Sequence, residues 1–212
     1  MQRNRTECRH QNRLLPVVAA DKIALVRPRR IPTSYRLQCL HSTHCGRKPQ
    51  LVRAMIMQIT PAADENLDEI NALMARSKAY WDWSPEYLDA ALRLMVLCSH
   101  YLRENLCFEV REDGELVGFL SVKDDPQGPV LDNLWVDPRR IGQGLGRRAC
   151  EFLFRLALRK RWPALYVVPD PPAEGFYSRM GFVDTGAREA SRVPGGPVFS
   201  VFKIEFRLLE AT

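Results

Sequence analysis

Three glycines at alternate positions stand where a predicted strand gives way to a helix. The stretch reads Val136-Asp-Pro-Arg-Arg-Ile-Gly142-Gln-Gly144-Leu-Gly146-Arg-Arg148. Glycine lets the backbone turn sharply and lets a ligand approach main-chain N–H groups closely. The unpaired N–H groups at the start of a helix carry partial positive charge and suit a phosphate or pyrophosphate. Because Arg140 and Arg147 can add charge pairing, this loop is predicted to bind a phosphorylated ligand.

Two well-known phosphate-binding loops fit this stretch poorly. A nucleotide P-loop ends in Gly-Lys-Ser/Thr, whereas two arginines follow Gly146. The dinucleotide fingerprint fits in its loose form, Gly144-x-Gly146-x-x-Ala149, with Asp170 near the place of the ribose acid. That fold, however, is built from successive βαβ units, and predicted hairpins precede this loop.

The loop resembles instead the acetyl-coenzyme A loop of the GNAT superfamily of N-acetyltransferases, Arg/Gln-x-x-Gly-x-Gly/Ala after a strand. The match is Ile141-Gly-Gln-Gly144-Leu-Gly146, and it departs from the pattern at Ile141, with Arg140 one residue early. A second stretch, Asp170-Pro-Pro-Ala173-Glu-Gly-Phe176-Tyr177-Ser-Arg-Met-Gly181-Phe182, is similar to the superfamily's closing segment. The run Ser77-Lys-Ala-Tyr-Trp81 also resembles a bacterial subgroup, so the resemblance extends over residues 57–207.

This resemblance implies an acyltransferase that moves the acetyl group of acetyl-coenzyme A to a primary amine, directly and within a ternary complex. It places coenzyme contacts on the strand before the loop, on the loop with its helix, and on the closing segment. The expected residues are Leu134, Trp135, Val136, Gly142, Gln143, Gly144, Leu145, Gly146, Arg147, Asp170, Ala173 and Phe176. A main-chain N–H of residues 134–136 would polarise the thioester carbonyl, and no metal is expected.

Two further groups must move protons, one taking a proton from the amine and one returning a proton to the departing thiolate. Tyr177 matches the tyrosine that serves as this acid in the superfamily, and a phenol with an ordinary pKa of about 10 suits an alkyl thiol. The alternative interpretation of Tyr177 is a buried aromatic side chain with a packing role.

Asp132 is the first candidate for the base. Alternation along the strand over 130–136 would turn its side chain away from Leu131 and Trp135, and its carboxylate flanks the thioester. An ordinary polar position at a strand edge explains Asp132 equally well. Glu109 is a weaker candidate for the base, and His100 is expected to be a surface histidine.

The elements that would position these residues follow from hydrophobic periodicity and turn signals. Strands are expected over 57–60, 107–110, 116–122, 130–136, 164–168, 182–184 and 198–207, and helices from 61–64, from Ser84, over 144–159 and over 172–180. The order β-α-α-β-β-β-α-β-α-β-β predicts an α+β protein with three α/β layers and a mixed, mostly antiparallel, GNAT-like sheet. The resemblance assigns acceptor recognition to residues 78–83 and 191–199.

The charge of the chain is distributed unevenly. Of its 212 residues, the first 56 hold twelve of the 31 Lys and Arg but two of the 25 Asp and Glu, so a net charge of +6 becomes −4 for the remaining 156. We expect residues 1–56 to be a basic, disordered segment and residues 57–212 to be the N-acetyltransferase domain. The segment has four interpretations: a nucleic-acid arm, a transit peptide, a secretory signal, or a stretch that is not made because translation starts at Met55 or Met57. The last, or a tail without function, is favoured.

Two other function classes stay open. A catalytically silent relative would bind acetyl-coenzyme A as a sensor, and a nucleic-acid-binding protein would use the basic segment. We favour the enzyme, with a small-molecule or peptide amine as acceptor, and do not expect nucleic acid as a partner; the resemblance allows a homodimer. The longest stretch without a polar residue, Leu14–Ala20, is too short to cross a membrane, and we expect a cytoplasmic protein.

Overall fold

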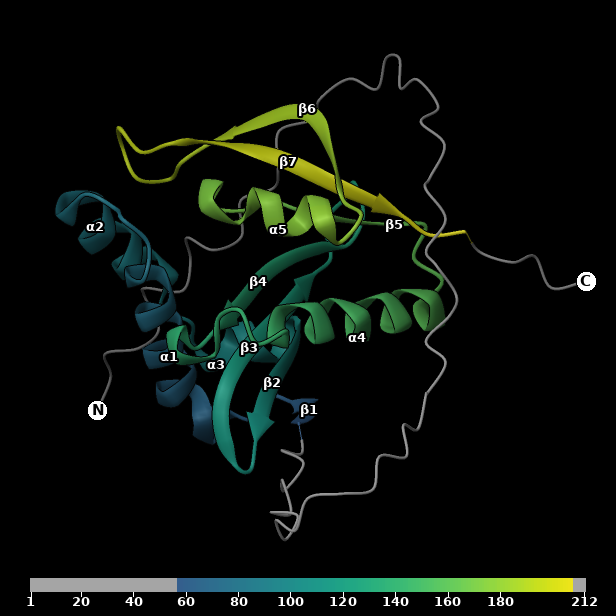
Figure 1. Ribbon diagram of the computed structural model, residues 1–212, viewed down its shortest axis with the longest axis horizontal. Coiled ribbons are helices and arrows are strands. Elements are labelled where there is room, and N and C mark those ends of the chain that lie inside the picture. Colours follow the sequence, from purple (N-terminus) through teal and green to yellow (C-terminus); the bar gives the residue numbers. More distant parts are fainter. Residues whose placement is uncertain (1–56, 208–212) are drawn as a thin grey trace, which may run out of the picture. The chain divides into compact units, whose positions relative to one another are not determined.

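The computed structural model describes residues 57–207, so the predictions for the basic segment lie outside the described residues. Seven strands form a sheet in the order β1-β2-β3-β4-β5-β7-β6 (Figure 1). Their bounds are β1 Met57–Pro61, β2 Leu106–Glu112, β3 Glu115–Lys123, β4 Val130–Val136, β5 Ala164–Val167, β6 Val183–Ala190 and β7 Val198–Glu205. All neighbours pair antiparallel except β4 and β5, which are parallel. The predicted mixed, mostly antiparallel sheet is confirmed.

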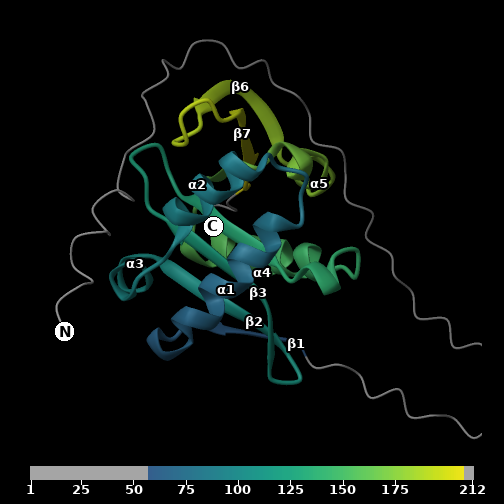
Figure 2. The same ribbon diagram turned by 90° about the vertical axis from the view of Figure 1, so that its left-hand side faces the viewer.

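Helices cover both faces of this sheet, as the two views in Figures 1 and 2 show. They are α1 Leu67–Ala79, α2 Pro85–Met95, α3 Ser99–Glu104, α4 Leu145–Lys160 and α5 Glu174–Arg179. The predicted order of elements is wrong at one point, because it lacks α3. A helix of six residues has fewer than two turns, too few for an apolar period to show in the sequence.

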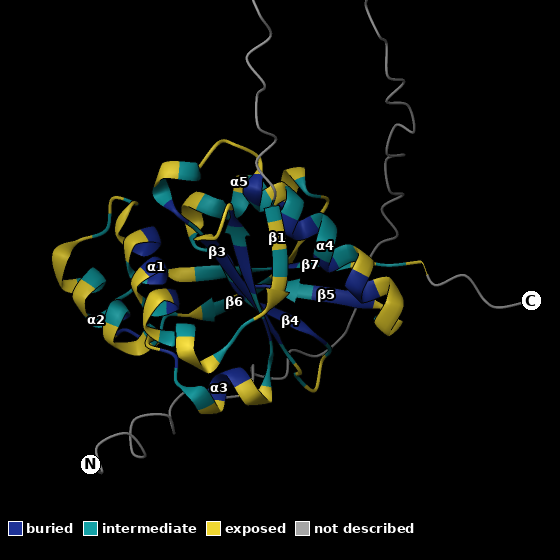
Figure 3. Cartoon of the chain, turned by 90° about the horizontal axis from the view of Figure 1, so that it is seen from below, coloured by how far each residue is buried: buried dark blue, intermediate teal, exposed yellow. Residues whose placement is uncertain are grey.

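Two hydrophobic cores result, one on each face of the sheet. Strand β3 serves both: Leu116 and Phe119 pack with residues of α1 and α3, whereas Val117 and Leu120 pack with residues of α4 and α5. Figure 3 shows this burial along the strands and on the inward sides of the helices. Neighbouring side chains of a strand point to opposite faces, and the register with β2 shifts between Val110 and Arg111, so Leu116 and Phe119 can share one face although they are three residues apart. Strand β3 therefore supplies both cores, which gives the three predicted layers.

The helix cap and the tight turn that the sequence predicts are both present. The hydroxyl of Ser84 accepts the N–H of Tyr87 at 3.3 Å and caps α2, with proline as the first helical residue. Asp113 and Gly114 both have positive φ, 48° and 88°, and make the predicted tight turn between β2 and β3. Several bounds differ from expectation, most clearly two of them: the helix expected over 172–180 begins as a 3-10 turn, Pro171–Ala173, and β6 is longer than predicted.

Within residues 57–207 no helix is long and apolar enough to cross a membrane. In the same range, no three side chains of His, Cys, Asp or Glu gather as a metal site would require.

Candidate active site

The parallel strands β4 and β5 separate soon after they meet. They pair only between Val130 and Tyr166 and between Leu131 and Val167, where β5 ends while β4 continues to Val136. A cavity of about 720 Å³ lies at this divergence. Its walls come from β4, from the start of α4, from the segment joining β5 to α5, from α1 to α3 and from the β6–β7 hairpin. The glycine loop and the closing segment therefore face the same space.

Two residues of β4 direct their main-chain N–H groups toward this cavity. Asp137 donates its N–H to the Val117 carbonyl of β3 at 2.9 Å. Two residues earlier, Trp135 lies opposite Phe119 of β3, so its main-chain N–H and carbonyl also point toward β3. Because successive N–H groups point to opposite edges of a strand, those of Leu134 and Val136 point to the edge that β5 leaves unpaired. Of the three residues expected to contact the thioester, Leu134 and Val136 therefore offer main-chain groups, while the main chain of Trp135 faces β3.

The glycine loop owes its shape to its glycines. Gly142 and Gly144 have φ of 80° and 82°, a conformation that side chains disfavour, and Gly144 is the N-cap of α4. A Cβ on Gly146 would lie 3.2 Å from the ring of Phe176, so glycine lets α4 approach α5. The first N–H groups of α4 have no intrahelical acceptor. Gly142, Gly144, Leu145, Gly146 and Arg147 line the cavity, as do Ala173 and Phe176 of the closing segment.

One predicted coenzyme residue does not line the cavity. Gln143 donates its side-chain amide to the Arg139 carbonyl at 2.8 Å and its main-chain N–H to the Arg140 carbonyl at 3.2 Å, so it stabilises the turn from within. Arg147 is largely exposed beside Glu151, with 3.0 Å between its Nε and the carboxylate. Arg140 also lines the cavity, and its guanidinium lies 3.5 Å from Glu115 and 3.9 Å from Glu112.

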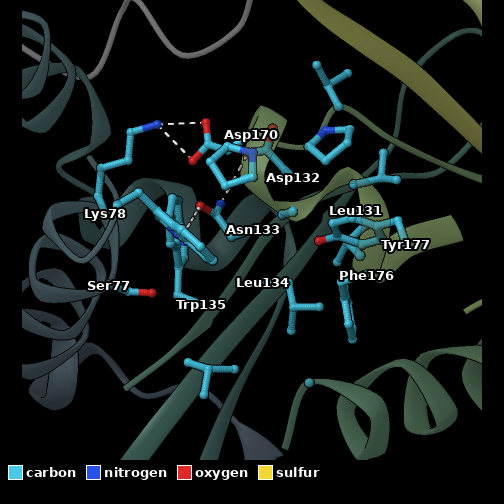
Figure 4. A pocket seen from close by; sticks show the side chains of 18 of the residues that line it. Ser77, Lys78, Leu131, Asp132, Asn133, Leu134, Trp135, Asp170, Phe176 and Tyr177 are labelled. Atoms are coloured by element: carbon cyan, nitrogen blue, oxygen red, sulfur yellow. Dashed lines mark hydrogen bonds and ion pairs between the residues drawn. The ribbon is translucent and has the colours of Figure 1, made fainter. Parts of the chain in front are cut away.

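Tyr177 lies on α5 with its hydroxyl directed into the cavity (Figure 4). The residue is 6% exposed, and among the described residues its hydroxyl has no hydrogen-bond partner. Burial, with the nearby Cys150 thiol and Asp170 carboxylate, raises the pKa of Tyr177 well above its ordinary value. The phenol therefore keeps its proton at neutral pH, as a proton donor must.

Asp132 also lines the cavity and is held from two sides. Its Oδ1 pairs with Lys123 Nζ at 2.7 Å, and its Oδ2 accepts the hydroxyl of Tyr101 at 2.5 Å. The expected alternation of β4 holds for Leu131, which packs in the other core, but not for Trp135, because the register with β3 shifts between Ser121 and Val122. Asp132 and its neighbour Asn133 consequently both reach Tyr101, and Asp132 keeps a partly exposed carboxylate on the cavity.

A buried ion pair in the cavity wall joins α1 to the segment after β5. Lys78 Nζ lies 2.7 and 2.8 Å from the two carboxylate oxygens of Asp170, and the two side chains are 5% and 16% exposed (Figure 4). The same ammonium group stands 4.3 Å from the ring centre of Trp83 and 5.4 Å from that of Tyr87. Asp170, expected at the coenzyme, has both oxygens engaged by Lys78. One feature of the sequence could have indicated that Lys78 is buried: it follows Met74 by four residues, which places it on the buried face of α1.

The expected acceptor residues lie only partly on the cavity. Lys78 and Trp81 of the first expected range line it, as do Ser191, Arg192, Val193 and Phe199 of the β6–β7 hairpin; Tyr87, outside both expected ranges, lines it too. Tyr80 is half exposed, and Trp83 stacks on Tyr87 with ring centres 4.8 Å apart, outside the lining. The apolar residues Ala91, Leu94, Met95 and Leu97, which lie on α2 and just after it, complete this wall.

The second candidate for the base is wrong. Glu109 is buried away from the cavity, where it accepts the Ala63 N–H at 3.1 Å, the Asn66 amide at 2.8 Å and Arg111 Nε at 2.8 Å. It joins β2 to the segment before α1. His100 is, as expected, a surface residue of α3, 3.2 Å from Glu104.

Comparison with known proteins agrees with this geometry. The sequence matches the acetyltransferase (GNAT) family over residues 70–182. It is 32% identical over 141 residues to the peptidyl-lysine N-acetyltransferase YjaB of Salmonella typhimurium, covering 64% of this chain and 89% of that protein.

Solved structures share the fold. A GCN5-related N-acetyltransferase from Rhodopseudomonas palustris superposes with a TM-score of 0.61 at 21% identity, over 72% of this chain and 99% of that chain. The PaiA N-acetyltransferase from Thermoplasma acidophilum, solved in complex with coenzyme A, gives 0.59 at 17% identity, over 72% and 100%.

Proposed function

The chain belongs to the GNAT acetyltransferase family, and from that premise we propose that it acetylates a primary amine by direct transfer from acetyl-coenzyme A in a ternary complex. One observation carries the proposal: a single cavity is lined by the glycine loop, the free edge of β4, Tyr177 and Asp132. Both reactants can therefore meet in it. The activity is assigned to residues 57–212.

Coenzyme binding is assigned to the end of the cavity at the glycine loop. The N–H groups at the start of α4 suit the pyrophosphate, with Arg147 and Arg140 as nearby cations. The N–H groups of Leu134 and Val136 suit the pantetheine arm and the thioester carbonyl, whose oxygen becomes negative during attack. The edge of β4 that lacks a strand partner supports this assignment.

The proton transfers are assigned to two polar groups that line this cavity, Asp132 and Tyr177. The acceptor nitrogen attacks the carbonyl carbon while its proton passes to the Asp132 carboxylate, directly or through one water. The carbon–sulfur bond then breaks, and the thiolate takes the Tyr177 proton. The position of the Tyr177 hydroxyl on the cavity supports this role; burial raises the pKa of Tyr177, which keeps its proton in place until the thiolate forms but makes it a weaker acid.

The acceptor class is proposed from the relative and from charge. The Salmonella protein is named a peptidyl-lysine N-acetyltransferase, so a lysine side chain is the first primary amine to test. A net charge of −4 over residues 57–212 favours a cationic acceptor modestly.

A thiol-release assay tests the proposal. The full chain is given acetyl-coenzyme A and a panel of lysine peptides, polyamines, amino acids and aminoglycosides, and the products are weighed by mass spectrometry. We expect release with at least one amine, a gain of one acetyl group on that amine, and release slowed by about 10²-fold or more in Asp132→Asn and Tyr177→Phe. Tight binding of acetyl-coenzyme A with no release across the panel would indicate the silent sensor instead.

A further inference from the structure

Helix α3 places one tyrosine hydroxyl among the polar groups of β3 and β4. Tyr101 is 7% exposed, and its Oη lies 2.5 Å from Asp132 Oδ2, 2.7 Å from Ser121 Oγ and 2.9 Å from Asn133 Nδ2. Ser121 and Asn133 are buried as well. Buried polar groups this close form a network in which each proton has a defined place.

Which group donates in each hydrogen bond of this network follows from the bond between Trp135 and Asn133. Trp135 Nε1 can only donate, and it lies 2.8 Å from Asn133 Oδ1, which makes that atom the amide oxygen. Asn133 Nδ2 must then donate to Tyr101 Oη and, at 2.8 Å, to Ser121 Oγ. An ionised carboxylate only accepts hydrogen bonds, so the proton of Tyr101 goes to Asp132 Oδ2. The Ser121 hydroxyl is then left as the donor to Tyr101 Oη.

Other charged and titratable groups also reach Asp132. Lys123 of β3 holds its other oxygen, and Cys107 of β2 and Glu189 of β6 interact with it electrostatically. Burial raises the pKa of Cys107 to about 12 and that of Tyr101 higher still, so both groups are neutral around pH 7. Glu189, which also interacts with Arg192, Lys123 and Asp125, has a pKa raised by burial. Glu189 is therefore the second group near Asp132 that can titrate in the acid range.

We infer that Tyr101 is a positioning residue for the reaction: it fixes Oδ2 of Asp132 and stabilises the ionised carboxylate that takes the amine proton. The inference rests on the proposed role of Asp132 as the base. Tyr101 keeps its own proton throughout, so the proton that leaves the amine is the only one that reaches the carboxylate. Lys123 neutralises Oδ1, which leaves Asp132 anchored at both oxygens while its exposed side faces the cavity.

The test is the pH dependence of kcat/KM for the full chain and its Tyr101→Phe variant, measured with an acceptor found in the panel. Protonation of the base produces a fall in rate toward acid pH. Removing a hydrogen bond to a carboxylate disfavours its ionised form, so we expect this acid limb to move up by about one pH unit. Tyr87→Phe removes a hydroxyl from the same cavity without a contact to Asp132 and should leave the limb in place.

The outcomes separate the inference from the function on which it rests. An acid limb that stays in place in Tyr101→Phe, whether or not the rate falls, overturns the inference. The same comparison is made with Glu189→Gln added to both the wild type and Tyr101→Phe. If the acid limb then no longer differs between them, the shift belongs to Glu189 and the inference is overturned. If Asp132→Asn keeps the wild-type rate and profile, the proposed base is wrong. Should Tyr101→Phe fail to fold, Ser121→Ala, which removes one donor to Tyr101 Oη, should move the limb in the same direction by less, and no movement would overturn the inference.

Discussion

Replacing Lys78 by methionine removes one half of the buried ion pair and keeps a side chain of similar length. The bond it breaks joins α1 to Asp170, 92 residues later, and both side chains are largely buried. Removing one partner of a buried pair costs about 3–5 kcal/mol, because the other charge stays desolvated and unpaired. Asp170 keeps some exposure to the cavity, so we expect the lower end, about 3 kcal/mol, and a fall in Tm of about 6–12 °C.

Urea unfolding of the full chain, followed by circular dichroism, measures this loss. The double variant Lys78→Met/Asp170→Asn should recover part of it, since no buried charge is then left alone. Arg93→Ala is the matched control: Arg93 pairs with Asp89 at 2.6 Å, but the two side chains are 77% and 65% exposed, so its loss should cost less than about 1 kcal/mol. If Lys78→Met were no more destabilising than Arg93→Ala, the ion pair would not hold α1 to this wall.

Three further changes test other parts of the site. Tyr177→Phe should lower kcat by about 10²-fold in the thiol-release assay while the Kd of acetyl-coenzyme A, measured by calorimetry, changes little, because the ring stays and the proton is lost. Gly146→Val should cost about 1–3 kcal/mol in urea unfolding, since even its Cβ would lie 3.2 Å from the Phe176 ring. Hydrogen bonds from Arg139 lower the pKa of Asp137 to about 2, below its unfolded value, so the stability it adds is present above pH ~4 and is lost as pH falls toward 2. Urea midpoints across that range should fall more steeply in the wild type than in Asp137→Asn.

Local signals in the sequence predict much of this fold. The proline after Ser84 and the Asp-Gly turn act on neighbouring residues, so their effect does not depend on distant contacts. Most strands of the sheet were predictable because they show an apolar pattern of their own, whereas β6, whose residues are mostly exposed, was predicted too short. Helix α3 was not, because its six residues contribute only two buried side chains, Tyr101 and Leu102.

The site divides in the same way. The glycine loop is a continuous stretch whose conformation depends on its own glycines, and the closing segment carries Phe176 and Tyr177 next to each other, so both could be recognised from residue order. The partners of Asp132 could not: Tyr101 comes from the unpredicted helix, and a register shift opposite β4 breaks the alternation used to orient the carboxylate. Glu109 was misplaced because only the packing of the segment before α1 shows which groups it bonds.

The sequence by itself determined the family resemblance, the strand order along the chain and the two segments that border the coenzyme, since these depend on neighbouring residues. The tertiary structure alone decided that β4 and β5 diverge to open a cavity, that Lys78 meets Asp170 in its wall and that Tyr101 holds Asp132. Each of these contacts joins residues at least 31 positions apart. Hydrogen bonds and ion pairs act over a few ångströms, so such pairs exist only once the sheet and its helices have brought the residues together.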